Sequence, residues 1–91
     1  VVISPNLEYI LQGNSQNFEC YLYKNGEKQD NQFKFLDISV GVPRKNYDVA
    51  TLGSNSFSIK NNLKYMKAPV LIQCKTENYE ETISILLRGL Y

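Results

Sequence analysis

Apolar and polar residues alternate along most of this chain with a period of two. The pattern is clearest in four segments, where apolar side chains recur at every second position: 18–22, 57–59, 70–74 and 83–87. Successive side chains of a β-strand point to opposite faces of its sheet, so this alternation predicts strands with one face in a core. No window carries a sustained helical stripe, and the nearest, 61–69, ends at a proline.

Turn-forming residues separate these segments at short intervals. Asn, Gly, Ser and Pro cluster at six places: 4–6, 13–15, 25–26, 41–43, 53–55 and 61–62. Seven or eight short strands divided in this way, without helices between them, predict an all-β sandwich or a small barrel.

The Asn25–Gly26 pair is a strong hairpin signal, because a type I′ turn needs positive φ at both central residues. A two-residue loop would pair Lys24 with Glu27. Continued along the strands, the same register would pair Phe18 with Phe33. An aromatic pair of that kind contributes a few tenths to about 1 kcal/mol.

Two irregularities interrupt the alternation. Pro5 divides the first apolar stretch into 1–4 and 7–11. Such a break suits an edge strand, and we expect this one to cross from one sheet to the other. The apolar parity also changes near Phe35–Leu36, where a bulge or a twist would reconcile the two halves.

Composition and charge mainly show which kinds of protein this chain does not resemble. The 91 residues fit one domain, which we expect to span 1–91 and to be a module of a longer protein. Ten Lys and Arg balance nine Asp and Glu, and a formal charge of +1 gives no reason to expect a nucleic-acid partner. Apolar runs such as 85–87 reach only three or four residues, far fewer than the roughly 20 of a membrane span, and no signal-peptide pattern is present.

Cys20 and Cys74 lie 54 residues apart, each on the apolar parity of a predicted strand. The spacing suits strands two and six of an immunoglobulin-type sandwich, although the core Trp and the tyrosine corner of antibody domains are missing. A disulfide closing this loop would contribute about 4 kcal/mol in the chain-entropy model. The alternative is a pair of reduced, buried thiols, which folding in a cytoplasm favours. Two thiolates without any His are too few for a metal site, so we expect no metal and no cofactor.

The sequence offers no catalytic constellation. Without histidine there is no Ser-His or Cys-His pair, and the nine carboxylates are scattered. The five glycines stand singly at turns, so no phosphate-binding loop is present. We therefore expect a protein that is not an enzyme, with no catalytic and no cofactor-binding residues.

Tyrosine is the one unusual excess, with seven residues in the chain. Three of them, in or near predicted loops, are candidate surface-binding aromatics: Tyr47, Tyr65 and Tyr79. Exposed Tyr can stack on a sugar or anchor a protein interface, whereas the plainer reading is that Tyr forms strands and covers a sheet. A flat face that joins Tyr21 and Tyr23 to Tyr9 would favour a carbohydrate-binding module.

Three segments carry a family resemblance: 1–27, 56–76 and 81–91. They resemble the Ig-like (Big-type) modules of structural proteins from tailed bacteriophages and prophages, especially minor tail proteins. The matching positions are structural: Pro5 at the kink after the first strand, Gly13 in the next turn, Phe18 in the core, Asn61–Asn62 and Tyr65 at the crossover, and Gly89 near the end. The cysteines depart from the family pattern.

This resemblance implies an immunoglobulin-like β-sandwich of about seven to eight antiparallel strands in two sheets. It implies a non-catalytic spacer or display module of a virion tail protein, with weak adhesion to the host surface. The expected partners are other virion proteins, the remaining domains of the parent chain and a host cell-surface glycan. The expected location is the virion or the bacterial cell surface, after synthesis in the bacterial cytoplasm. The alternatives are a carbohydrate-binding module of a cell-wall-acting enzyme and a module of a bacterial surface adhesin.

Overall fold

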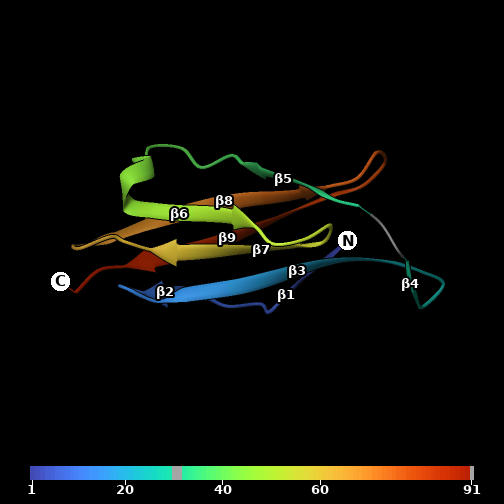
Figure 1. Cartoon of the computed structure of the whole chain (residues 1–91), viewed down its shortest axis with the longest axis horizontal. Helices are drawn as coiled ribbons and strands as arrows, with labels where there is room; N and C mark the ends of the chain where they lie inside the picture. The colour runs from blue at the N-terminus through green and yellow to red at the C-terminus, as the bar shows by residue number, and fades with distance from the viewer. Residues whose placement is uncertain (30–31, 91) are drawn as a thin grey trace.

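The computed structural model describes residues 1–29 and 32–90, which form two β-sheets packed face to face (Figure 1). The described elements follow one another in this order: β1 (Val2–Ser4), β2 (Tyr9–Leu11), β3 (Ser15–Lys24), β4 (Glu27–Gln29), β5 (Lys34–Asp37), the 3-10 turn η1 (Arg44–Asn46), β6 (Tyr47–Thr51), β7 (Ser56–Asn61), β8 (Lys67–Lys75) and β9 (Glu80–Arg88).

The strand order is that of an immunoglobulin-like sandwich. One sheet has the order β1-β3-β7-β6, with β4 added to β3, and the other has the order β2-β9-β8-β5. These orders correspond to the ABED and CFG sheets of immunoglobulin domains, with β2 as an extra strand beside the last one. The predicted all-β sandwich is confirmed, with nine described strands in place of seven or eight.

The first strand changes sheets at Pro5, as predicted. β1 pairs with β3 in one sheet, and β2 pairs with β9 in the other. The expectation of antiparallel strands throughout was wrong here, because β2 and β9 are parallel. The chain keeps its direction on both sides of the kink at Pro5. β2 therefore lies parallel to β9 when it joins the second sheet.

The hairpin was predicted correctly at its turn and wrongly further along. Lys24 pairs with Glu27, and Asn25 and Gly26 have φ values of 52° and 78°. Since β4 ends at Gln29, the pairing stops before it could reach Phe18. Phe18 pairs instead with Phe57 of β7, and the two rings stack with their centroids 5.2 Å apart.

The predicted irregularity near Phe35–Leu36 is not found. β5 pairs with β8 in unbroken register from Lys34 to Asp37. Leu36 and Ile38 lie on the outer face of the sheet, where both are exposed. The parity change in the sequence therefore marks apolar residues that face solvent, and no bulge is needed.

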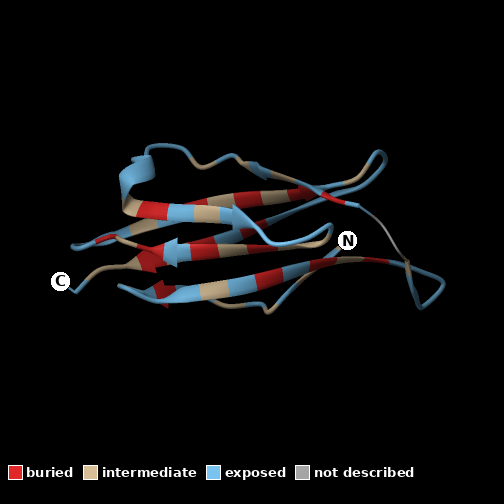
Figure 2. Cartoon of the chain, in the orientation of Figure 1, coloured by how far each residue is buried: buried red, intermediate tan, exposed pale blue. Residues whose placement is uncertain are grey.

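Buried and exposed residues alternate along the strands, and the core lies between the sheets (Figure 2). The two facing layers meet around Phe18, Phe57 and Ile59 on one side and Ile72, Ile85 and Leu87 on the other, all fully buried. Phe35 of β5 contacts Phe57 across the layers, with ring centroids 5.1 Å apart. Phe35 belongs to β5, which corresponds to the strand that carries the core Trp in antibody domains.

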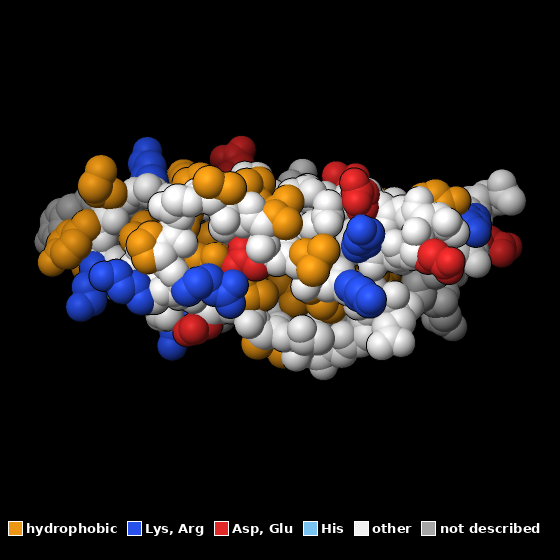
Figure 3. Space-filling view, turned by 90° about the horizontal axis from the view of Figure 1, so that it is seen from above, with side chains coloured by type: hydrophobic (Ala, Val, Ile, Leu, Met, Phe, Trp, Pro, Cys, Tyr) orange, Lys and Arg blue, Asp and Glu red, His pale blue; other side chains and the backbone are white. Residues whose placement is uncertain are grey.

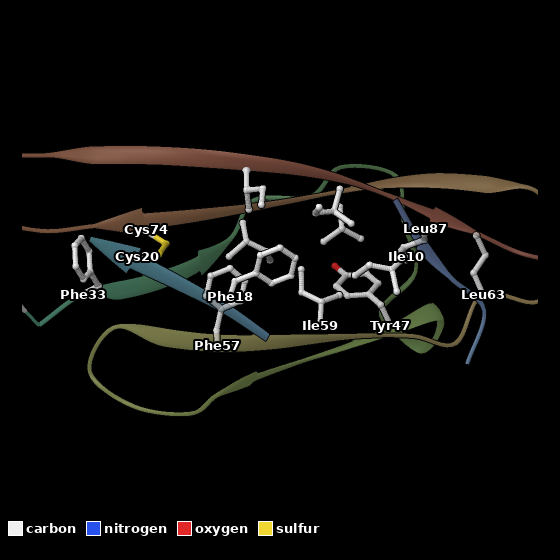
Figure 4. Packing of buried hydrophobic residues seen from close by; sticks show 14 of the residues in the cluster. Ile10, Phe18, Cys20, Phe33, Tyr47, Phe57, Ile59, Leu63, Cys74 and Leu87 are labelled. Carbon is white, nitrogen blue, oxygen red and sulfur yellow. A yellow bond between two sulfur atoms is a disulfide. The ribbon is translucent and has the colours of Figure 1, made fainter. Parts of the chain in front are cut away.

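Cys20 of β3 and Cys74 of β8 form a disulfide between the two sheets (Figure 4). Their Cα atoms are 6.5 Å apart, and both residues are fully buried. Of the two alternatives left open by the sequence, the structure has the bridged form. It joins the strands that carry the inter-sheet disulfide of immunoglobulin domains.

The sandwich is elongated, with extents of 45 × 19 × 18 Å. The N-terminal strand begins toward one end of the long axis, and the last described residues lie at the other end (Figure 1). Within 1–29 and 32–90, no helix is long and apolar enough to span a membrane.

Candidate functional site

Tyr47 is not a surface aromatic, so this part of the predicted site was wrong. It is the first residue of β6, only 2% exposed, and its ring lies in the core (Figure 4). The strand begins directly after η1, and the residue occupies an inward position opposite Asn61. The sequence placed it in a loop because polar residues and Pro43 precede it.

The Tyr47 hydroxyl joins the open edges of the two sheets. It donates a hydrogen bond to Oδ2 of Asp37 in β5 at 2.5 Å. Nη1 of Arg44 contacts the same oxygen at 2.6 Å, and the backbone N–H of Ser39 donates to Oδ1 at 3.0 Å. We call this group the latch, because the carboxylate of Asp37 in β5 binds both Tyr47 of β6 and Arg44 of η1.

The latch changes the acidity of both partners. Burial raises the pKa of Asp37, but the hydrogen bonds from Ser39 and Tyr47, aided by Arg44, outweigh it, so this pKa lies below its usual value. Burial raises the pKa of Tyr47, and the hydrogen bond to Asp37 raises it further. The pair therefore favours an ionised carboxylate and a neutral phenol.

The two other candidate tyrosines lie at opposite ends of the molecule. Tyr65 precedes β8 and is 62% exposed, whereas Tyr79 lies in the turn after β8 and is 45% exposed. The nine residues of β8 separate them. Nζ of Lys24 lies 5.8 Å from the centroid of the Tyr79 ring. The three predicted aromatics thus form no common site.

A flat aromatic platform is not formed either. Tyr21 and Tyr23 belong to β3, whereas Tyr9 belongs to β2 in the other sheet. The rings of Tyr21 and Tyr23 meet edge to face, with centroids 6.4 Å apart and planes inclined by 62°. Nζ of Lys28 lies 3.7 Å from the centroid of the Tyr21 ring. The arrangement required for a planar sugar-stacking face is therefore lacking at these three tyrosines.

A hollow lined by both polar and apolar surface lies at the end of the sandwich that carries Tyr65. Its volume is about 420 Å³, and we call it the Tyr65 hollow; its lining is Lys45, Asn46, Asn62, Leu63, Lys64 and Tyr65. One wall belongs to η1 and the other to the loop between β7 and β8. The backbone N–H of Asn62 donates to the carbonyl of Asn46 at 2.9 Å, so the walls are hydrogen-bonded to each other. In Figure 3, Lys and Arg side chains gather beside hydrophobic ones at this end.

Asn61, at the end of β7, supports the loop from inside the protein. Its side chain is fully buried. Nδ2 donates to the carbonyls of Ile10 in β2 and Arg88 in β9, at 2.6 and 3.0 Å. Oδ1 accepts the backbone N–H of Leu63 at 2.8 Å. One amide thus ties two strands of the other sheet to the first residues of the loop.

The other side of the loop between β7 and β8 is hydrogen-bonded to the residues that follow β9. The backbone N–H groups of Gly89 and Leu90 donate to the carbonyls of Met66 and Lys64, at 2.8 and 3.0 Å. A Cβ at position 89 would lie 2.6 Å from the backbone nitrogen of Tyr65, so only glycine allows this approach. Met66 has a φ of 67°, a left-handed conformation that is uncommon outside glycine. The surrounding hydrogen bonds hold the loop in this shape.

The chemistry available here is that of a binding site. Ammonium groups, side-chain amides and a phenol ring can bind a ligand by charge, hydrogen bonds and stacking. Within the described chain, no group of three or more His, Cys, Asp or Glu could hold a metal ion. The sequence singled out Tyr65 but gave Lys64 no role beyond solvating a loop, assigned Asn61 and Asn62 only to a crossover, and did not consider Lys45 and Asn46. The burial of Asn61 could have been predicted from the sequence, because Asn61 continues the alternation that turns Phe57 and Ile59 inward.

Comparisons with known proteins bear on the fold. No family model and no curated protein matches the chain. Among solved structures, it is similar to an endo-fucoidan hydrolase of glycoside hydrolase family 107, with a TM-score of 0.56, 12% identity and 94% of this chain covered. A DUF4784 family protein from Bacteroides caccae aligns over 96% of this chain with a TM-score of 0.47 and 14% identity. The chain spans only 12% and 23% of their lengths, and at such identity the first similarity supports the sandwich fold alone.

Proposed function

We propose that this chain is a non-catalytic, load-bearing immunoglobulin-like spacer module of a virion protein, in the tail of a bacteriophage or prophage. The sequence resemblance to tail-protein modules supports the virion, and the arrangement of the terminal strands supports the mechanical role. Its partners would be neighbouring virion proteins and the other domains of its parent chain.

The parallel pairing of β2 and β9 is the observation that carries this proposal. Tyr9, Ile10 and Leu11 pair with Leu86, Leu87 and Arg88. β2 follows the N-terminal segment and β9 leads to the C-terminus, and both strands run in the same direction. Tension on the two ends would pull these strands past each other. Their hydrogen bonds would then be loaded together, whereas an antiparallel pair pulled from one end opens one bond at a time.

The disulfide supports the same role and the proposed location. It joins the second and the sixth strand of the immunoglobulin order across the core, so residues 20–74 could not be extended by force while it is intact. Disulfides persist in oxidising surroundings, which agrees with the exterior of a virion or a bacterial cell surface. A module of a surface adhesin would be loaded in the same way, and the domains encoded beside this one would distinguish the two.

Force spectroscopy on the full chain, held between two inert folded domains, tests the mechanical role. The N–H of Leu86 donates to the carbonyl of Glu8 at 3.1 Å, so in this parallel ladder Ile10, and not Tyr9, turns its N–H toward β9. Ile10→Pro therefore removes a backbone N–H from the parallel pair, and Ile10→Ala is the matched control, because it shortens the same side chain and keeps that N–H. We expect Ile10→Pro to lower the main unfolding force well below that of Ile10→Ala. Equal forces for both variants would reject β2 and β9 as the load-bearing pair.

A further inference from the structure

We propose that the Tyr65 hollow binds a saccharide that carries a negative charge, such as a sugar phosphate or a uronic acid. The inference deepens the proposed function, because it names the chemistry that the end of the spacer would recognise on a cell surface. It depends on that function only for its biological setting, since binding by the hollow can be measured on its own.

The charges at this end favour an anion. Lys45 and Lys64 line the hollow. Asp37 is paired with Arg44 in the latch, whereas Asp48, which accepts a hydrogen bond from Nδ2 of Asn62 at 2.9 Å, keeps its negative charge because an amide is neutral. The two ammonium groups outnumber this one carboxylate, so the charge balance at the hollow is positive.

The uncharged groups favour a sugar over a bare anion. The Tyr65 ring stands 62% exposed beside the hollow, where it can cover the apolar face of a pyranose. Asn46 supplies an amide group that can both donate to and accept from hydroxyl groups, and Asn62, whose Nδ2 already donates to Asp48, supplies an amide oxygen that can accept from one. A phosphate or sulfate ion alone would use only the lysines, whereas a charged sugar would also contact the ring and the amides.

The size and the rigidity of the hollow are those of a small binding site. Its volume of about 420 Å³ lies in the range of roughly 300–1,000 Å³ that is typical of ligand pockets. A loop that served only to connect β7 to β8 could relax, but this one is fixed by Asn61 on one side and by the chain at Gly89 on the other. A preorganised loop loses little conformational entropy when a ligand binds, which favours even a weak ligand.

The competing occupant is a second copy of this chain. The opposite end of the sandwich carries Glu77, Glu80 and Glu81 around the turn between β8 and β9. These carboxylates could meet the lysines of a neighbouring molecule head to tail. They carry no sugar-like face for Tyr65, so we favour the saccharide, and the experiment separates the two.

The test is an NMR titration of the ¹⁵N-labelled full chain with glucose 6-phosphate, glucose and inorganic phosphate in separate arms at constant ionic strength. We expect saturable shifts in the amides of residues 45–46 and 62–65 with glucose 6-phosphate. Its affinity should exceed those of glucose and of phosphate by about tenfold. Tyr65→Ala should weaken binding about tenfold, and Lys64→Ala about threefold to fivefold. The matched changes at the other end, Tyr79→Ala and Lys75→Ala, should leave it unchanged.

Three results would overturn the inference. Equal affinities for phosphate and glucose 6-phosphate would mean that only the charge is bound. Shifts that appear at both ends of the molecule and grow with protein concentration would indicate the second copy. No saturable shift with any of the three probes at tens of millimolar would mean that the hollow binds none of this chemistry. None of these results would change the force measurement, so failure of the site and failure of the spacer remain distinguishable.

Discussion

The side chain of Asn61 offers the sharpest test of how this sandwich is held together. Its amide reaches Ile10 in β2, Arg88 in β9 and the backbone of Leu63 in the loop. It therefore connects both strands of the proposed load-bearing pair to the loop that forms the Tyr65 hollow. Replacing it with alanine removes all three hydrogen bonds without altering any apolar side chain.

The expected cost follows from what is left behind. Asn61→Ala leaves two carbonyls and one N–H without their present partner in a region where the side chain is fully buried. Each such loss costs about 1 kcal/mol net, and more where water cannot replace the lost partner, so we expect a destabilisation of about 3–5 kcal/mol. A domain of this size has a free energy of unfolding of roughly 5–14 kcal/mol. The substitution would remove a large part of it.

Urea unfolding followed by tyrosine fluorescence and circular dichroism measures this effect. Asn62→Ala is the matched control, because the neighbouring amide donates to Asp48 at the exposed surface. We expect the control to stay within about 0.5 kcal/mol of the wild type. If Asn61→Ala also stays within that margin, the buried network is not a major source of stability and the reasoning fails.

Three further changes probe the cross-link, the latch and the loop. Reducing the bridge between Cys20 and Cys74 should lower the free energy of unfolding by about 4 kcal/mol, and alkylation without reductant should add no label; two labels would mean free thiols. Because the pKa of Asp37 is lowered on folding, its contribution to stability is complete above about pH 4 and is lost as the pH falls through the folded-state pKa. Tyr47→Phe should cost about 2 kcal/mol in urea unfolding at neutral pH and make the acid-induced loss smaller, whereas an unchanged acid transition would contradict the latch. Gly89→Ala should cost about 1–3 kcal/mol and shift the amide resonances of the adjoining loop; wild-type spectra and stability would show that the close contact is unimportant.

The strands and their facing layers were predictable because period-two alternation reports burial directly. Phe18, Cys20 and Cys74 lie in the core where the parity placed them, and the spacing of the cysteines anticipated strands that face each other. The turn at Asn25–Gly26 was predictable for a local reason, because few residues tolerate positive φ.

Pairing between strands that are far apart in the sequence was harder to predict. The sequence continued the hairpin to a partner for Phe18, whereas the actual partner, Phe57, comes from a strand that no local signal links to it. The parallel pairing of β2 with β9 likewise follows from the sheet that each strand joins, which alternation does not encode.

The site was predicted only in part, because loop residues follow no period. Tyr65 was correctly expected at the surface, but Tyr47 was assigned to the same class although its strand turns it inward to bond Asp37. Lys45 and Asn46 line the hollow because η1 is hydrogen-bonded to the loop after β7, which is distant in the sequence. Contacts of this kind depend on three-dimensional packing and leave no mark on the spacing of residues.

The extension of the full chain under force, compared with and without reductant, tests most directly the claim that this is a bridged sandwich suited to bearing load. We predict a single abrupt unfolding event in both conditions. After reduction, its gain in contour length should be greater by roughly 175–180 Å, because the sequence separation of 54 between the bridged cysteines is released at about 3.4 Å per residue, less the 6.5 Å that the bridge itself spans. Equal gains in the two conditions, or gradual lengthening without an abrupt event, would contradict the account.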